Sequence, residues 1–200
     1  MSSKQQLICI TGADGTGKST LIKALAERMP NVYIANIWDL LEDTQGLLFR
    51  SKQDIDQFLC ALNPDARVLF LAHALNYSTS KALRSDAETI LFNAYWYKYF
   101  ATELAMGASE ALVQSLISSL PEMHQVIRLK LNPEQAAKRK QKFSKYECGA
   151  DGRNSAADFI RFQQTALPRW NKFESKAWVN IDASKSIEEV LQDTLTALQK

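Results

Sequence analysis

Residues 12–19 of the chain read Gly12-Ala13-Asp14-Gly15-Thr16-Gly17-Lys18-Ser19. They match G-x-x-x-x-G-K-[ST], the phosphate-binding loop of nucleoside-triphosphate enzymes. An apolar run at 7–10 precedes this loop and helical spacing follows it over 19–29, so it joins a predicted strand to a predicted helix. The glycines let backbone N–H groups point at phosphate oxygens, and the start of the helix favours an anion. The sequence therefore predicts a nucleoside-triphosphate site that extends from Gly12 to Thr20.

Three side chains of this loop have expected roles. Lys18 brings positive charge to the β- and γ-phosphates, and the Ser19 hydroxyl is the candidate Mg²⁺ ligand. Asp14 is a candidate for orienting the metal through water or for steering the acceptor, and the alternative is a simple turn residue. We therefore expect ATP and Mg²⁺ as cofactors, with Lys18 and Asp14 in the catalytic group.

Length and composition favour a compact α/β enzyme. The chain has 200 residues, 46% of them apolar, which suits one domain with a sizeable core. No apolar run is long enough to span a membrane, and the polar start is no secretory signal. Three cysteines without metal-ligand spacing indicate a cytoplasmic, reducing compartment. A net charge of +2 gives no indication of nucleic-acid binding.

Strand and helix patterns alternate along the whole sequence. Short apolar strands are predicted at 7–10, 31–34, 89–92, 124–131 and 178–181. Helical segments separate them, with an interruption near Gly46 and a kink or division at Pro168. This order predicts an α/β fold of P-loop NTPase type, with a five-stranded parallel sheet and helices on both faces. We expect one domain over residues 1–200, with ligands at the carboxyl ends of the strands.

A basic cluster follows the predicted fourth strand. Lys138, Arg139, Lys140, Lys142 and Lys145 lie within eight positions, and Arg153 is close behind. Such a cluster is usually a solvated helix face or a nucleic-acid patch. Beside a phosphate loop, we interpret it as a mobile lid over about 138–155 that neutralises charge on the transferring phosphoryl group. Arg139 and Arg153 are the candidate catalytic residues of this lid.

Several segments together resemble the thymidylate kinase family of P-loop nucleoside monophosphate kinases. The loop carries that family's Asp-Gly at its middle, Asp14-Gly15, and Phe70-Leu71-Ala72 resembles the helix that lines the monophosphate pocket. Pro133-Glu134 with Lys138-Arg139 resembles the opening of the lid, and residues 159–190 resemble the C-terminal strand and helices. The resemblance implies ATP-dependent transfer to a nucleoside monophosphate, with dTMP or a related deoxynucleotide first. It also implies nucleotide substrates as partners and admits a homodimer.

The chain departs from the family where the acceptor should lie. The family's Asp-Arg-Tyr at the end of the third strand is Asn93-Ala94-Tyr95 here, which removes the arginine that holds the acceptor phosphate. The pocket arginine that helps to read the base is replaced by Ala74, and the glutamate before the loop is replaced by Thr11. These replacements remove charge from the acceptor side.

Other residues are candidates for the missing contacts. Lys98 lies one helical turn after Ala94 and is the first candidate for the acceptor phosphate, against the alternative of a surface lysine. Arg50 and Lys81 are weaker candidates. Phe70 and Tyr95 are candidate walls of a base pocket, although aromatic residues at helical spacing usually indicate core, and Trp38 is interpreted as packing. The substrate-binding prediction covers Phe70, Ala74, Tyr95 and Lys98.

Two alternatives to a monophosphate kinase stay open. A monophosphate acceptor is already ionised and needs no general base, whereas a nucleoside hydroxyl needs one. Asp39, just past the second predicted strand, is the candidate base for a kinase of a nucleoside or another small hydroxyl compound. The second alternative is a nucleotide-binding protein without transfer activity. Lys18 and Ser19 argue against it, and Asn93-Ala94 argues for it.

Overall fold

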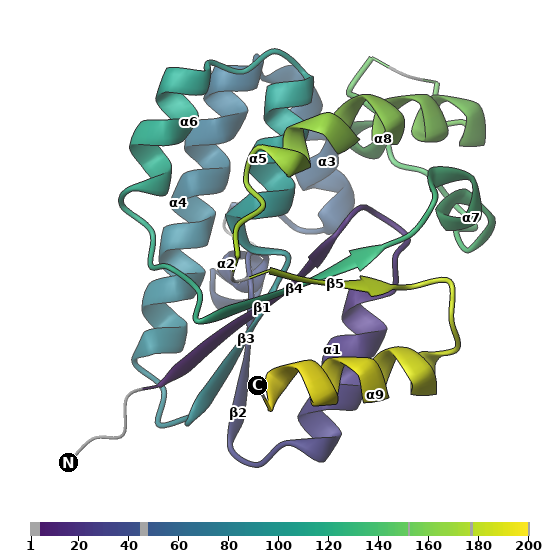
Figure 1. The fold of residues 1–200 in the computed structure, drawn as a ribbon. Helices are drawn as coiled ribbons and strands as arrows, with labels where there is room; N and C mark the ends of the chain where they lie inside the picture. The colour runs from purple at the N-terminus through teal and green to yellow at the C-terminus, as the bar shows by residue number, and fades with distance from the viewer. Residues whose placement is uncertain (1–4, 45–47, 152, 177, 200) are drawn as a thin grey trace.

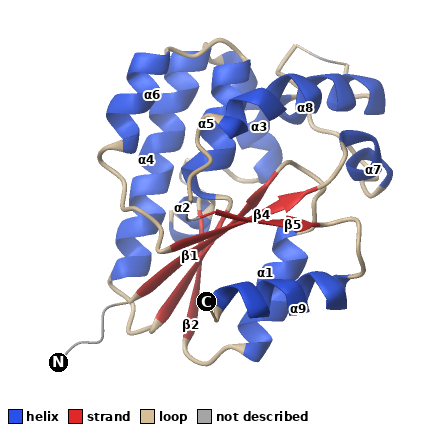
Figure 2. Cartoon of the chain, in the orientation of Figure 1, coloured by secondary structure: helices blue, strands red, loops and turns tan. Residues whose placement is uncertain are grey.

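All five predicted strands are present and run parallel in one sheet (Figures 1 and 2). The computed structural model describes residues 5–44, 48–151, 153–176 and 178–199. The strands are β1 (Gln6–Gly12), β2 (Val32–Asn36), β3 (Thr89–Asn93), β4 (Gln125–Lys130) and β5 (Trp178–Asp182). Their order in the sheet is β2-β3-β1-β4-β5, so β1 lies at the centre. The predicted fold class is therefore confirmed.

Helices cover both faces of the sheet. In Figure 1, α1 (Lys18–Arg28) and α9 (Ile187–Leu198) lie on one face, and α4 (Pro64–Leu83), α5 (Tyr95–Ala105) and α6 (Glu110–Ile117) lie on the other. Ile8 and Ile10 of β1 belong to the core beneath α1 and α9, whereas Leu7 and Cys9 belong to the core beneath α4 and α5. Because both faces are covered, a central strand has to be apolar along its whole length.

Four further α-helices and one 3₁₀ helix complete the described part of the fold. They are α2 (Asp39–Asp43), α3 (Lys52–Ala61), α7 (Pro133–Lys138), the 3₁₀ helix η1 (Tyr146–Cys148) and α8 (Ala156–Asn171). The expected interruption at Gly46 lies outside the described residues. Of the kink or division expected at Pro168, the division is wrong, because α8 continues through the proline to Asn171. The proline lies in the last turns, and Phe159 and Trp170, both buried, hold the helix against the core.

Two helices begin with the same Asn-Pro pair that the sequence indicates. The Asn63 side chain accepts a hydrogen bond from the backbone N–H of Ala66 at 2.9 Å, and Pro64 follows in the first turn of α4. Asn132 caps α7 in the same way, accepting from the N–H of Glu134 at 2.8 Å. These caps satisfy donors that have no partner within the helix, and proline fits where no N–H is needed.

The carboxyl ends of the central strands meet at one edge of the sheet. Asn93 of β3 pairs in register with Ile10 of β1 and with Asn36 of β2. The phosphate loop after β1, the turn after β3 and the chain after β2 therefore lie side by side. This edge is the expected ligand site of an open parallel sheet. None of the helices that the structure describes is both long and apolar enough to cross a membrane.

Candidate active site

Residues 12–19 connect β1 to α1, as the sequence predicts, and their glycines are required by the backbone. Gly12 and Gly15 have φ angles of 147° and 79°. A Cβ atom added to Gly12 would lie 2.6 Å from the backbone oxygen of Leu129, and one added to Gly15 would lie 2.8 Å from that of Ala136. Side chains are thus excluded from both positions by the backbone conformation and by neighbouring chain. The loop forms a cradle of the kind that fits phosphate oxygens.

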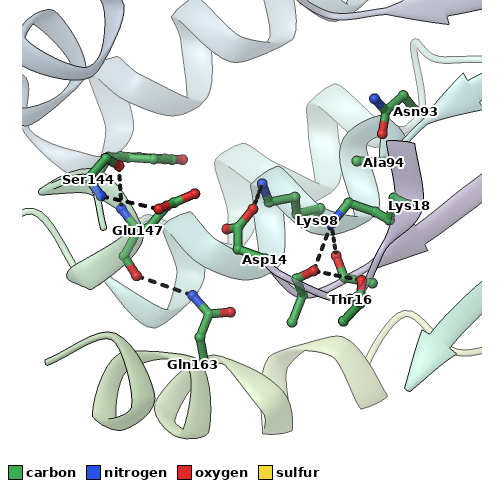
Figure 3. Close-up of polar contacts among 12 residues, drawn as sticks. Asp14, Thr16, Lys18, Asn93, Ala94, Lys98, Ser144, Glu147 and Gln163 are labelled. Atoms are coloured by element: carbon green, nitrogen blue, oxygen red, sulfur yellow. Dashed lines mark hydrogen bonds and ion pairs between the residues drawn. The ribbon is translucent and has the colours of Figure 1, made fainter. Parts of the chain in front are cut away.

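Lys18 is folded into this cradle and is buried. Its Nζ donates hydrogen bonds to the carbonyl oxygens of Gly12 at 2.9 Å and Ala13 at 2.7 Å (Figure 3). The Thr16 hydroxyl donates to the same Ala13 oxygen at 2.9 Å. Burial, and after it the positive charge of Lys98, lower the pKa of Lys18 to about 7. An anion in the loop would supply the negative charge that the buried ammonium lacks.

Lys98 and Asp14 form an ion pair beside the loop. Figure 3 shows the two side chains pointing toward each other, with Lys98 Nζ 2.5 Å from Asp14 Oδ1. Burial acts to raise the pKa of Asp14, but the charges of Lys98 and Lys18 outweigh it and leave that pKa below its usual value. Burial likewise acts to lower the pKa of Lys98, and Asp14 outweighs it and leaves that pKa above its usual value. Both groups are therefore charged near neutral pH.

A cavity of about 680 Å³ opens on the side of the loop where Lys98 lies. α3 forms one wall, Trp38 and Tyr99 form another, and the segment 142–147 closes over it. Lysine side chains gather around the cavity, namely Lys52, Lys98, Lys142 and Lys145. A small anion with an apolar or aromatic body suits such a lining. We call this space the acceptor cavity.

A second cavity of about 390 Å³ lies on the other side of the loop. Gly15, Gly17 and Thr20 line it together with residues of the β5–α9 connection. Arg139 also lines it and donates a hydrogen bond from Nη2 to the backbone oxygen of Ala183 at 2.8 Å. The phosphate loop thus lies between two cavities. We call this second space the donor cavity.

The turn after β3 has an unusual backbone. Ala94 and Tyr95 have φ angles of 74° and 48°, a region that residues other than glycine seldom adopt. The buried Thr11 hydroxyl donates to the Ala94 carbonyl oxygen at 3.0 Å, and the Ala94 N–H donates to the Ile10 oxygen at 2.9 Å. These bonds hold the turn against the end of β1. Nothing in the sequence indicates this conformation, since no glycine marks it.

Several predicted site residues lie away from the acceptor cavity. Phe70 packs in an aromatic cluster, with ring centroids 5.7 Å from Phe49 and 5.2 Å from Phe58. Ala74 is fully buried, and Tyr95 is 1% exposed with its hydroxyl donating to the Pro121 oxygen at 3.1 Å. Among the described residues that line either cavity, Phe70, Ala74 and Tyr95 do not occur.

The other candidates divide between the site and the surface. Trp38, interpreted from sequence as packing, lines the acceptor cavity and meets Tyr99 edge to face at 6.1 Å. Arg153 is exposed, and its backbone N–H bonds to Asp158. Lys81, the weaker phosphate candidate, forms an ion pair with Asp43 at 2.8 Å. For Trp38, the sequence signal of a site residue is its position just after the end of β2, where ligands of such sheets bind.

Ser19 is the residue for which the sequence predicts a metal role. It is exposed in the first turn of α1, and Asn93 Nδ2 lies 3.5 Å from its hydroxyl oxygen. The described residues contain no cluster of three His, Cys, Asp or Glu side chains that could hold a metal. A Mg²⁺ ion at Ser19 therefore fits only if phosphate oxygens and water supply its other ligands, which is the usual arrangement for nucleotide-bound Mg²⁺.

Comparison with known proteins gives one consistent answer. The family model described as thymidylate kinase matches residues 10–194. A curated relative from Saccharolobus solfataricus, described as "Probable thymidylate kinase 1", is 27% identical over 199 residues, covering 98% of each chain. The solved thymidylate kinase of Candida albicans superimposes with a TM-score of 0.72 at 16% identity, over 100% of this chain and 93% of that one. At that identity the structural match speaks for the fold alone.

Proposed function

The chain belongs to the thymidylate kinase family, and from this we infer that it transfers the γ-phosphoryl group of ATP to dTMP. The observation that carries the assignment of roles is that Lys18 is buried in a glycine cradle whose Gly15 and Gly17 line the donor cavity and whose Asp14 contacts Lys98 of the acceptor cavity. If one nucleotide occupied each cavity, the phosphates of the two nucleotides would meet near Lys18. The kinase acts as one domain over residues 1–200, with a lid at about 138–155.

The donor side binds ATP through the loop and its flanks. Loop N–H groups and Lys18 take the β- and γ-phosphates, and Arg139 lines the donor cavity beside the loop. Ser19 would hold Mg²⁺ through its hydroxyl, and the ion would supply positive charge that offsets the charge of the triphosphate. When ATP binds, the Lys18 ammonium exchanges its hydrogen bonds with the Gly12 and Ala13 carbonyl oxygens for contacts with the phosphates. The ammonium is then paired with full negative charge.

On the acceptor side, Lys98 replaces the arginine that the family carries at position 94. An ammonium group has three donors, and Asp14 occupies one of them. The others remain for the acceptor phosphate in the same cavity. Lysine acts there as a point charge, without the paired geometry of an arginine fork. Asp14 keeps Lys98 in place and thereby steers the acceptor.

Transfer itself needs positioning and charge neutralisation more than proton chemistry. The acceptor phosphate is ionised near neutral pH, so the in-line reaction requires no general base. Lys18 and the lid cations stabilise charge on the transferring group, with Arg139 and Arg153 as the proposed lid residues. Asp39 accepts a hydrogen bond from the Asn36 N–H at 3.3 Å and has no step in this reaction.

We also propose the setting in which the kinase works. Its partners are nucleotides rather than nucleic acids. Its three cysteines are free, which suits a cytoplasmic, reducing compartment. A homodimer is a further proposal, which rests on the family resemblance, and the exposed Leu69 of α4 is a candidate contact for it.

The test is ADP formation from ATP and Mg²⁺ against a panel of nucleoside monophosphates and nucleosides, with Lys18→Ala as the blank. Turnover should be fastest with dTMP or a related deoxynucleotide. Lys98→Met should raise the KM for dTMP by about 10-fold to 100-fold, because a hydrogen bond to a charged group contributes about 1.5–3 kcal/mol. At pH 7 the KM for ATP should change by about twofold at most. Lys23→Met, an exposed lysine on α1, is the matched control. An unchanged KM for dTMP in Lys98→Met would rule out the acceptor role of Lys98.

A further inference from the structure

Away from the phosphate loop, three buried polar side chains form a connected group. Arg67 of α4 donates from Nε to Glu103 Oε2 of α5 at 2.7 Å. Tyr146 of η1 donates its hydroxyl to Glu103 Oε1 at 2.6 Å. The three residues are 4%, 0% and 8% exposed. A charged pair is seldom buried so completely without a function or a strong structural reason.

Each polar atom of the group has a defined partner. Arg67 also donates from Nη1 to the backbone oxygen of Leu62 at 2.7 Å. Burial raises the pKa of Glu103, and the hydrogen bonds from Tyr146 and Arg67 oppose that rise. Burial and the Glu103 carboxylate raise the pKa of Tyr146 well above its usual value, so its hydroxyl keeps the proton that it donates. Arg67 and Tyr146 thus occupy one oxygen of Glu103 each.

Tyr146 belongs to the basic segment that closes over the acceptor cavity. Its backbone N–H donates to Asp56 of α3 at 3.3 Å. Its neighbour Glu147 pairs with Lys140 at 3.0 Å, and Gln163 of α8 donates to the Glu147 backbone oxygen at 3.2 Å (Figure 3). Of these contacts, the Tyr146 hydroxyl bond is the one that reaches a charged group buried in the core.

We propose that Glu103, oriented by Arg67, is a positioning residue that seats the lid over the acceptor cavity through the hydroxyl of Tyr146. The pairing of Glu103 with Arg67 allows this contact between Tyr146 and Glu103 to form and break reversibly. When the lid leaves, Glu103 loses the hydrogen bond from Tyr146 but keeps its counter-charge, so opening does not leave an unpaired buried carboxylate. The effect on the acceptor rests on the proposed function, whereas the seating of the lid does not.

Limited trypsin digestion tests the seating without any need for activity. The lid itself supplies cleavage sites at Lys138, Arg139, Lys140, Lys142, Lys145 and Arg153. Tyr146→Phe removes only the hydroxyl and should speed cleavage within 138–153 by about tenfold, since a bond to a charged group contributes at least that factor. Tyr77→Phe is the control, because it removes a hydroxyl that donates to Asp43 at 2.8 Å outside the lid. Equal lid cleavage in Tyr146→Phe and wild type would overturn the proposal, as would faster cleavage across the whole chain.

A double variant tests the same contact by changing the core residues that Tyr146 binds. Arg67→Met with Glu103→Leu replaces the ion pair by apolar groups, which a folded core often tolerates. Tyr146 then lacks its acceptor, and the lid should be cut as fast as in Tyr146→Phe. In both variants the KM for dTMP should rise about tenfold while the KM for ATP stays within twofold. Faster lid cleavage in an enzyme that phosphorylates no deoxynucleotide would support the seat and reject the proposed acceptor. If the double variant folds and its lid is cleaved no faster than that of the wild type, the proposed role of Glu103 in holding the lid is wrong.

Discussion

The lowered pKa of Lys18 predicts that nucleotide binding takes up a proton. In the free loop, burial and the charge of Lys98 hold this pKa at about 7, against an ordinary value of about 10.4. At pH 8 about nine-tenths of the Lys18 side chains are then neutral. Triphosphate oxygens restore the positive charge because they favour the ammonium form. Binding at pH 8 should therefore absorb about 0.9 proton.

The same linkage sets how ATP affinity depends on pH. A site that must be protonated to bind loses affinity as pH rises above its free pKa, up to the pKa of the complex. With a free pKa of about 7, the apparent Kd for ATP should rise about 50-fold between pH 7 and pH 9. The rise should stop near the ordinary pKa of lysine, where the bound group also begins to lose its proton.

Titration calorimetry in two buffers of different ionisation enthalpy measures both quantities in the absence of acceptor. Lys98→Met removes the neighbouring charge that lowers the pKa of Lys18 and leaves Asp14 to raise it. In that variant the rise in Kd should fall below about tenfold over the same pH range. Lys23→Met should behave as wild type. A wild-type Kd that changes less than about threefold between pH 7 and pH 9 would refute the reasoning.

Two further substitutions test contacts that the structure shows and the sequence does not reveal. Thr11→Val should lower the free energy of unfolding by about 1–3 kcal/mol in denaturant titrations, because it leaves the buried Ala94 oxygen without its donor; Thr11→Ser keeps the hydroxyl and should lose clearly less, and equal losses would contradict the role of that bond. Arg67→Met alone should cost about 3–5 kcal/mol, since Glu103 is left buried and unpaired. Thermal unfolding of Arg67→Met beside the Arg67→Met, Glu103→Leu double variant measures this, and a single variant as stable as the double one would contradict it.

The fold could be predicted because its signals are local. Each strand is a short apolar run bounded by turn residues, and Asn63 and Asn132 mark helix starts by their own side-chain chemistry. The phosphate loop is likewise a contiguous pattern with a physical role at each position. Pro168 does not divide its helix, because tertiary packing outweighs the loss of one hydrogen bond near a helix end.

The acceptor side could not be predicted to the same depth because its contacts join distant residues. Lys98 and Asp14 are 84 positions apart, and Arg67 and Glu103 are 36 apart. The helix that begins at Tyr95 is aromatic on nearly every side and buried along most of its length. Periodicity therefore could not tell which ring faces the cavity, and Tyr99 rather than Tyr95 lines it.

The ion pair between Lys98 and Asp14 also links the two substrates electrostatically. With the acceptor phosphate at Lys98, as proposed, the charge that lowers the pKa of Lys18 would be offset, and a larger fraction of Lys18 would carry the proton that favours ATP binding. At pH 8 this can tighten ATP binding by up to about tenfold, and ATP must tighten acceptor binding by the same factor. Lys98 is suited to this coupling because it contacts Asp14, a residue of the phosphate loop itself. Measuring the Kd of a non-hydrolysable ATP analogue at pH 8 with and without dTMP, in wild type and Lys98→Met, tests this coupling. Equal coupling in both proteins would place its origin elsewhere.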